Sequence, residues 1–309
     1  MKIYSQILRK SCLVQGFLFL MLFSFSLKSQ SLDSSLVKKR TRILLGTEVL
    51  GFSGMLYGLD KLWYSDYPRS KFHWFNDNNE WLQMDKVGHF GTAYYYGWMG
   101  YEATKWTGIS DKKAIWWGGT AGFAFLTVIE TLDAFSAEWG ASPGDLIANT
   151  GGTFMFIGQQ LAWGEQRLIM KFSHKPSSYA KYRPEALGAS YTEQLFKDYN
   201  AQTYWLSGNI ASFTKKEGRL SFLNIALGYS GDGMTGGSSN PDFNALGEPV
   251  PSFQRARQFY LSLDADLSKI PVKNKFLKST LKVINLIKVP FPGIEYHTVE
   301  GLKWNWLAY

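Results

Sequence analysis

The spacing of apolar residues changes once along the chain, and this change constrains the fold more than any other feature. Residues 34–170 hold long stretches without a charge, such as LIANTGGTFMFIGQQLAWG at 146–164. Stretches of this length predict helices. From about residue 200, apolar and polar residues alternate over three segments, at 223–230, 259–267 and 302–307. Because a period of two is typical of half-buried strands, we expect the second part of the chain to be strand-rich.

Four helices are expected in the first part, at about 34–62, 84–107, 111–134 and 142–170. The predicted fold class is mainly α: an antiparallel four-helix bundle with a C-terminal strand-rich extension that forms a small antiparallel sheet. Gly, Thr or Gln interrupts each apolar stretch, so none is a clean membrane span of about 20 apolar residues. Small residues are nevertheless common where membrane helices pack closely. We expect a bundle embedded in or apposed to a membrane, and the alternative is a periplasmic bundle surrounded by water.

The N-terminus has the three parts of a secretory signal. Basic residues precede the apolar run CLVQGFLFLMLFSFSL at 12–27, and small or polar residues follow it. This order predicts a signal peptide over 1–30, with an uncleaved anchor helix as the alternative. Cys12, the only cysteine, lies at the start of the apolar run and not after it. We therefore expect no lipid anchor, no disulfide and no thiol chemistry in the mature chain.

The expected organisation follows from these shifts in composition. It is a signal peptide (1–30), a helical bundle (31–170), a basic and polar crossover (171–203) and a strand-rich extension (204–309). Within the extension, FLKSTLKVINLIKV at 276–289 predicts a short basic amphipathic helix that ends before Pro290.

Charge and aromatic content indicate the kind of partner. The net charge is +8, and the basic cluster KKRTR at 38–42 fits a membrane surface or a solvated helix end. Aromatic residues make up 17% of the chain, with 12 Trp, and such residues favour membrane interfaces, although an aromatic-rich core is the alternative. We expect a membrane lipid or an envelope protein as partner. No nucleic-acid module is present, so no nucleic acid is expected.

The motif DKVGHF at 85–90 begins the second expected helix. Asp85 and His89 are four residues apart and share a helix face, and Asp85 lies in the first turn, where an acid favours the helix dipole. A carboxylate one turn from an imidazole can orient the ring or raise its basicity. The alternative is an N-terminal charge beside a histidine that is hydrogen-bonded inside the bundle.

The segment ETLD at 130–133 ends the third expected helix. The helix dipole makes this a poor place for Glu130 and Asp133, so their position is costly unless a lysine, a metal or a hydrogen-bond donor compensates. Lys86 is a candidate for that role. Glu138 is expected to be a loop charge.

The segment SPGDLIANTGG at 142–152 begins the fourth expected helix. Ser142 at the N-cap, a proline after it and Asp145 at the third helical position form a variant of the capping box. This explains Asp145 without catalysis. Asn149 lies one turn further on the same face, and an amide that faces inward from an apolar helix must find partners.

In an antiparallel bundle the second and fourth helices start at the end where the third helix finishes, so their polar residues would converge there. The candidate site residues are Asp85, Lys86, His89, Glu130, Asp133, Asp145 and Asn149. One histidine and several carboxylates could bind a divalent metal, run acid–base hydrolysis or form a closed hydrogen-bond network. The sequence has no HExxH, GxSxG, P-loop or Rossmann motif, so no resident cofactor is evident and nucleotide chemistry is not expected.

These three motifs, in this order, resemble the YfiM-like family of predicted periplasmic proteins, whose members include lipoproteins. The resemblance covers about residues 80–165 and implies helices in a Gram-negative cell envelope, without an established activity. A more distant similarity is to VanZ-like membrane proteins, which share a DK-x-x-H start and an S-x-x-D-x-x-x-N helix. The positions carried over are Asp85, Lys86, His89, Glu130, Asp133, Ser142, Asp145, Asn149 and Gly152.

The predicted function is that of an uncharacterised, membrane-associated cell-envelope protein with a structural or interaction role. The alternative is a hydrolase or transferase that acts on an envelope lipid or glycan, with His89 as acid or base and the carboxylates positioning a metal or substrate. We expect the protein on the periplasmic side of the envelope. The outer membrane is favoured because Tyr309 follows an alternating strand, as in the C-terminal strands of outer-membrane proteins.

Overall fold

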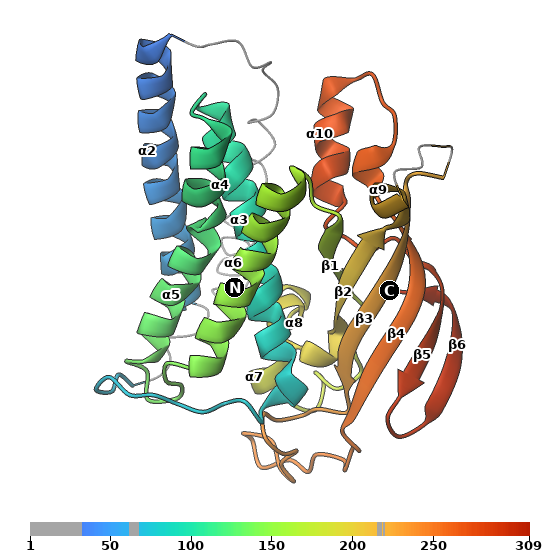
Figure 1. Ribbon diagram of the computed structural model, residues 1–309. Coiled ribbons are helices and arrows are strands. Elements are labelled where there is room, and N and C mark those ends of the chain that lie inside the picture. Colours follow the sequence, from blue (N-terminus) through green and yellow to red (C-terminus); the bar gives the residue numbers. More distant parts are fainter. Residues whose placement is uncertain (1–32, 62–67, 215–217, 219) are drawn as a thin grey trace, which may run out of the picture. The chain divides into compact units, whose positions relative to one another are not determined.

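The computed structural model describes residues 33–61, 68–214, 218 and 220–309 (Figure 1). The predicted signal peptide, with Cys12, lies outside the described residues. The chain divides into two compact units. The helical unit consists of the described residues up to Asn76 together with Thr92–Gly164, and the sheet unit consists of Asp77–Gly91 and Glu165–Tyr309.

The helical unit is named for the long helices that it holds, which follow one another along the chain. These are α2 (Ser34–Leu59), α3 (Met84–Trp106, from Thr92 onward), α4 (Asp111–Gly119), α5 (Ala121–Asp133) and α6 (Pro143–Trp163). The helix expected over 111–134 is thus two consecutive helices that meet at Thr120. In the described part of the chain, no helix has both the length and the apolar character that a membrane span requires.

Stacked rings and close glycine contacts pack these helices. Phe125 of α5 stacks with Phe52 of α2 and with Tyr96 of α3, with ring centroids 5.3 and 5.1 Å apart. Gly100 of α3 and Gly118 of α4 lie so close that a Cβ on either residue would come within 2.3 Å of the other's backbone. Both positions therefore require glycine, because a side chain would force the two helices apart.

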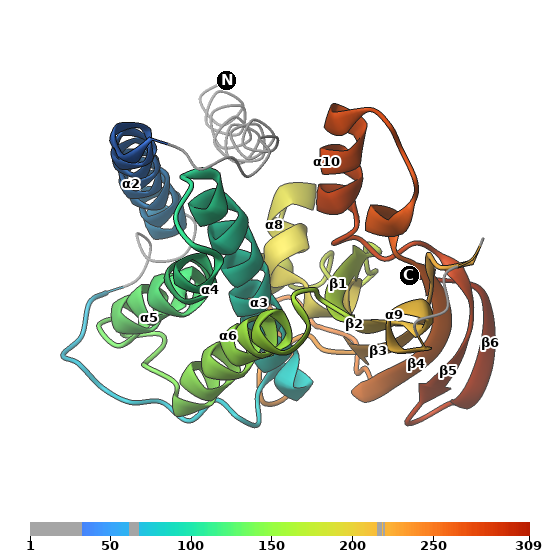
Figure 2. The same ribbon diagram turned by 45° about the horizontal axis from the view of Figure 1, so that its top comes forward.

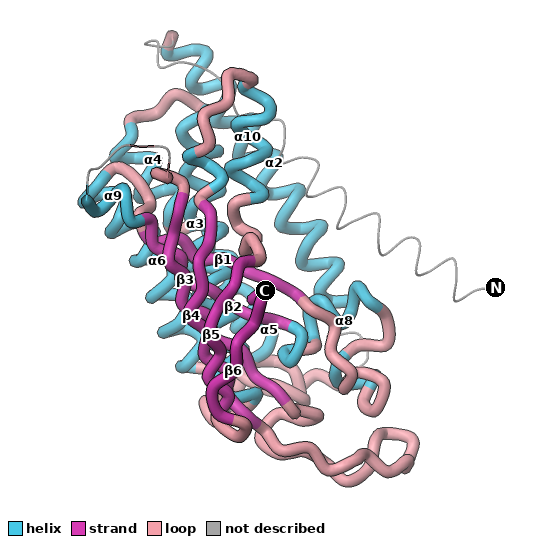
Figure 3. Tube along the Cα trace, turned by 90° about the vertical axis from the view of Figure 1, so that its right-hand side faces the viewer, coloured by secondary structure: helices cyan, strands magenta, loops and turns pink. Residues whose placement is uncertain are grey.

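The sheet unit is built on six antiparallel strands that pair in the order of the chain (Figure 3). They are β1 (Leu168–His174), β2 (Gln202–Asn209), β3 (Leu223–Asp232), β4 (Ala256–Ala265), β5 (Phe291–His297) and β6 (Gly301–Ala308). Short helices lie in the connections: α7 (Pro184–Leu187), α8 (Tyr191–Lys197), α9 (Ile210–Thr214) and α10 (Lys275–Ile284). Its described residues also form the 3-10 turns η2 (Trp81–Gln83), η3 (Tyr199–Ala201) and η4 (Leu267–Lys269). Figure 2 shows that the strands follow an arc from β1 to β6.

The predicted fold class is wrong, because the sheet is neither small nor an extension of a simple four-helix bundle. It has six strands, and further helices accompany it. The alternating segments correctly indicated β3, β4 and β6. The basic amphipathic helix is present as α10, but it ends at Ile284, earlier than the expected end before Pro290. The remaining strands were missed. β1 follows the last helix so closely that its apolar residues read as the end of that helix, and β5 contains Pro292 and Gly293, which weaken a strand signal.

Candidate functional site

One face of the sheet is apolar on all six strands. Paired residues of neighbouring strands have their side chains on the same face. One row of partners runs across the sheet through Met170, Leu206, Leu227, Leu261, Ile294 and Trp304. The next row on this face consists of Phe172, Tyr204, Tyr229, Phe259, Tyr296 and Leu302. We call the side of the sheet that carries these two rows the apolar face. Neither row contains a charged residue.

The apolar face is exposed on the last four strands. Leu261 on β4 is 50% exposed and Trp304 on β6 is 55% exposed. The other exposed members are Ile225, Leu227, Phe259, Leu263, Ile294, Tyr296, Leu302 and Trp306. On β1 and β2 the first turns of α3 cover the face, where a Cβ on Gly88 would lie 2.9 Å from the Tyr204 hydroxyl. Water therefore contacts large apolar side chains over four adjacent strands.

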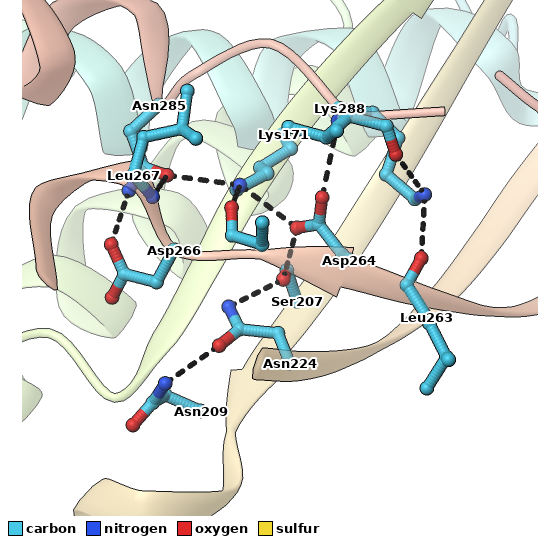
Figure 4. Close-up of polar contacts among 12 residues, drawn as sticks. Lys171, Ser207, Asn209, Asn224, Leu263, Asp264, Asp266, Leu267, Asn285 and Lys288 are labelled. Carbon is cyan, nitrogen blue, oxygen red and sulfur yellow. Dashed lines mark hydrogen bonds and ion pairs between the residues drawn. The ribbon is translucent and has the colours of Figure 1, made fainter. Parts of the chain in front are cut away.

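The opposite face, which we call the polar face, is mostly buried on β1 to β5, whereas Lys303 on β6 is exposed. Figure 4 shows the polar contacts on this face. Lys171 on β1 and Asp264 on β4 are both fully buried, with Nζ 2.8 Å from Oδ2. Lys171 also donates to the backbone oxygen of Ala265 and to Asn285 Oδ1, at 2.8 and 3.0 Å. Asp264 accepts further hydrogen bonds from Ser207 Oγ at 2.6 Å and from the backbone N–H of Val289 at 3.1 Å. These contacts satisfy charged groups that would otherwise be very costly to bury.

Lys288 is a second buried lysine on the polar face. Its Nζ lies 4.8 Å from the ring centroid of Trp205 and donates to the backbone oxygens of Leu263 and Val289, at 2.8 and 2.7 Å. Burial lowers the pKa of Lys288 to about 8, against the opposing effect of Asp264 and with the help of Lys171. The indole of Trp205 donates in turn to Ser173 Oγ at 2.9 Å.

The sheet is therefore inside out relative to a common half-buried sheet. Antiparallel sheets in water usually pack their apolar face on a core and solvate the polar one. Here the polar face of β1 to β5 is mostly buried among its own hydrogen-bond partners, and the apolar face is exposed on β3 to β6. The arrangement can bind an apolar surface, because Lys171 and Asp264 are turned away from it. The Arg257 guanidinium of β4, by contrast, is held by the Tyr229 hydroxyl and Gln83 at the end of this face.

The predicted site residues Asp85, Lys86 and His89 lie in the sheet unit, in the first turns of α3. Tyr199 of η3 donates a 2.5 Å hydrogen bond to Asp85 Oδ1. Lys86 Nζ lies 3.2 Å from Asp85 Oδ2 and 2.7 Å from Asp77 Oδ2. His89 Nε2 is 3.8 Å from Asp85 Oδ1, which is beyond hydrogen-bond distance. The predicted shared face of Asp85 and His89 is confirmed, and both oxygens of Asp85 have donors.

The ionisation of Asp85 follows from these neighbours. Burial acts to raise the pKa of Asp85, but His89, Lys86 and the Tyr199 hydroxyl outweigh it and hold the pKa below its ordinary value. A carboxylate and an imidazole one turn apart are ligand types that bind divalent metals. The expected metal stays a prediction. The contacts observed within the sheet unit form a network that ties the start of α3 to η3.

A left-handed turn precedes this network. Trp81, Leu82 and Gln83 have φ angles of 46°, 52° and 63°, which are strained for residues with side chains. Contacts from the strands hold them: the Tyr229 hydroxyl donates to the Leu82 oxygen, and the Arg257 guanidinium donates to Gln83 Oε1. The entry into α3 is thus fixed by side chains of β3 and β4.

The predicted site residues Glu130, Asp133, Asp145 and Asn149 lie in the helical unit. Glu130, at 3% exposure, accepts a 2.9 Å hydrogen bond from the backbone N–H of Ser142. This donor offsets the unfavourable position of a carboxylate near the end of α5. The predicted cap is confirmed, because Ser142 Oγ accepts from the Asp145 N–H at 3.1 Å.

Other members of this set differ in burial. Asn149 is fully buried in α6, as expected, whereas Asp133 is half-buried at the end of α5. Glu138 is exposed in the loop after α5, also as expected. Each set of site residues thus lies within its own unit. The convergence of the two sets stays a prediction.

Sequence reasoning missed the residues that organise the sheet unit, above all Lys171, Lys288, Asp264 and Tyr199. One signal was available, since a lysine in the middle of the apolar strand LIMKFSH is unusual unless it is paired. Its partner Asp264 is 93 positions away, so no local pattern could identify it.

Comparison with known proteins found a family model that matches part of the chain. Residues 73–157 match the family model DUF2279, described as a predicted periplasmic lipoprotein. The matched residues include all seven predicted site residues. No curated protein and no solved structure matches the chain. The family match supports a periplasmic envelope protein of unknown function, and the YfiM-like and VanZ-like resemblances stay predictions.

Proposed function

We propose that this protein is a structural or interaction protein of the cell envelope that binds to a lipid bilayer through the apolar face of its sheet. The observation that carries the proposal is the inside-out polarity of that sheet. Exposed contiguous apolar surfaces mark sites of protein or membrane binding. Moving one large apolar side chain out of water stabilises a complex by about 1.5–3 kcal/mol, so several together would favour binding.

The composition of the apolar face favours lipid over a protein partner. A protein interface usually has a polar rim that forms hydrogen bonds with its partner. The exposed rows of this face instead consist of aliphatic and aromatic residues. The polar side-chain atoms of these exposed rows belong to Tyr296 and Trp304, which are residue types enriched where a membrane meets water.

The internal hydrogen bonding of the sheet also suits an apolar medium. Unpaired backbone groups are costly in hydrocarbon, and all inner strands of this sheet pair on both sides. The charged pair Lys171–Asp264 is satisfied on the opposite face. A bilayer can therefore contact the apolar face without the burial of an unpaired charge.

Flotation with phosphatidylcholine vesicles tests the proposal. The double variant Leu227→Asp/Leu261→Asp places two carboxylates in one row of the apolar face, and we expect it to lose vesicle binding at least tenfold. The matched control is Leu220→Asp/Leu246→Asp, at positions 68% and 82% exposed outside the sheet, which we expect to bind like the parent. Thermal unfolding checks that both variants fold. Equal binding by the two double variants would contradict the proposal.

A further inference from the structure

Helix α10 is amphipathic and basic. Its sequence KFLKSTLKVI places Lys275, Lys278 and Lys282 on one side of the helix, each about one turn after the one before it. Phe276 and Leu277, at the start of the apolar side, are 68% and 45% exposed. A basic side next to an exposed apolar side is the pattern of helices that lie in the surface of a membrane.

The segment around α10 has no acidic residue. Between Asp266 and Glu295 the chain carries six lysines and neither Asp nor Glu: Lys269, Lys273, Lys275, Lys278, Lys282 and Lys288. Lys288 is buried and Lys269 approaches Glu165, whereas Lys273, Lys275 and Lys278 are exposed. These three ammonium groups therefore give the segment an exposed positive charge.

Backbone hydrogen bonds attach this segment to the sheet. The N–H of Phe172 on β1 donates to the Leu286 oxygen at 2.9 Å, and the Lys288 N–H donates to the Phe172 oxygen at 3.0 Å. Ile287 is thereby the partner of Phe172, a residue of the apolar face. Ile287 is 56% exposed, while Lys288 points to the polar face. The chain that follows α10 thus places the exposed side chain of Ile287 beside Phe172, on the same side of the sheet as the apolar face.

We propose that Lys273, Lys275 and Lys278 bind the phosphate groups of anionic phospholipids while the exposed apolar residues of α10 insert beside them. This inference rests on the proposed function and adds the lipid class. The chemistry is charge complementarity, since a lysine near an anionic membrane surface strengthens binding by about fivefold. The attraction acts within about 10 Å at moderate salt, so it weakens as salt is added.

The test compares vesicles of phosphatidylcholine with vesicles that also contain phosphatidylglycerol. For the parent protein we expect binding at least tenfold tighter to the anionic vesicles at low salt. The variant Lys273→Gln/Lys275→Gln/Lys278→Gln should lose this gain and keep its binding to phosphatidylcholine. The control Lys175→Gln/Lys181→Gln/Lys303→Gln removes three exposed lysines elsewhere in the sheet unit, and it should keep most of the gain.

The outcomes separate the lipid class from the proposed function. A parent protein that binds both vesicle types equally would overturn the lipid class alone. The same holds if the α10 variant keeps the full gain, or if the control loses as much as that variant. A parent protein that binds neither vesicle type would overturn both proposals.

Discussion

Lys171 and Asp264 form an ion pair with a 2.8 Å separation and no exposure of either side chain. Burial lowers the pKa of Lys171, and the charge of Asp264 opposes that effect. The pair joins β1 to β4 on the polar face, with Asn285, Ser207 and the Val289 N–H as further partners. The charges of Lys171 and Asp264 are thus neutralised on the polar face, and the two rows that define the apolar face carry none.

Loss of one member of this pair is expected to destabilise the fold strongly. In Lys171→Met the carboxylate of Asp264 stays buried without its counter-charge, so we expect the free energy of unfolding to fall by about 3–5 kcal/mol. Urea unfolding at neutral pH measures the loss. The control Lys181→Met changes an exposed lysine and should stay within about 0.5 kcal/mol of the parent. Equal effects would show that the buried pair does not stabilise the sheet.

Lys288 should make stability depend on alkaline pH. Its pKa is about 8 in the folded protein, below its ordinary value of 10.5, and the first cause is burial. Below pH 8 both the folded and the unfolded protein hold this proton, so the cost of burying the charge is fully present. As pH rises from 8 to 10.5, the folded protein loses this proton before the unfolded protein does, and the cost of burying the charge disappears.

Lys288→Met removes this group and serves as the reference. We expect the stability of the parent, relative to Lys288→Met, to increase by about 3 kcal/mol between pH 8 and pH 10.5. Urea unfolding of both proteins across this range gives the difference, and subtraction cancels the titration of other groups. A difference that stays constant with pH would contradict burial of a charged Lys288.

Gly88 is expected to be required where α3 meets β2, whereas Gly91 is not. A Cβ at Gly88 would lie 2.9 Å from the Tyr204 hydroxyl oxygen, but at Gly91 the nearest atom is 3.6 Å away. We expect Gly88→Ala to cost about 1–3 kcal/mol. Gly91→Ala should stabilise by up to about 1 kcal/mol, because alanine favours the helix.

The background variant Tyr204→Phe removes the clashing oxygen, and the next atom of that ring is 3.5 Å from the added Cβ. In this background Gly88→Ala should no longer destabilise. Thermal unfolding of the four proteins of this cycle measures the coupling. An unchanged cost in the Tyr204→Phe background would show that the hydroxyl is not the cause.

Tyr199→Phe should weaken the network at the start of α3. The Tyr199 hydroxyl donates to the Asp85 carboxylate, and hydrogen bonds to charged groups contribute about 1.5–3 kcal/mol. The pKa of Asp85 is held below its ordinary value of 3.8, so its contribution is present above that pH and is lost as pH falls. The deficit of Tyr199→Phe should therefore shrink in acid. Urea unfolding at neutral pH and near pH 3 measures it, with exposed Tyr191→Phe as the control.

Local patterns predicted the elements that short-range physics determines. The cap at Ser142 and the shared face of Asp85 and His89 depend on residues within one turn. The alternation at β3, β4 and β6 is a period-two pattern that can be read along each strand without knowledge of its partners. β1 was missed because its apolar residues 168–170 were assigned to the end of the fourth helix, although α6 ends at Trp163 and the polar residues 165–167 separate the two elements.

The polarity of the sheet could not be predicted from the sequence. Alternation shows that a strand has two kinds of face, but not which face is buried, and burial of the apolar face is the usual case. The reversal depends on pairs far apart in the chain, such as Lys171 with Asp264 and Tyr199 with Asp85. Only the folded topology brings these residues together.

The central claim is that the apolar face enters a bilayer, and neighbouring positions on β6 test it most directly. Trp304 pairs with Ile294 on the apolar face, and Lys303 pairs with Glu295 on the other. In a Cys12→Ser background, Trp304→Cys and Lys303→Cys each receive the fluorophore NBD. With phosphatidylcholine vesicles, we predict a blue-shifted, brighter emission at position 304 that doxyl lipids quench, and little change at position 303. Equal responses at both positions, or none at 304, would contradict the account.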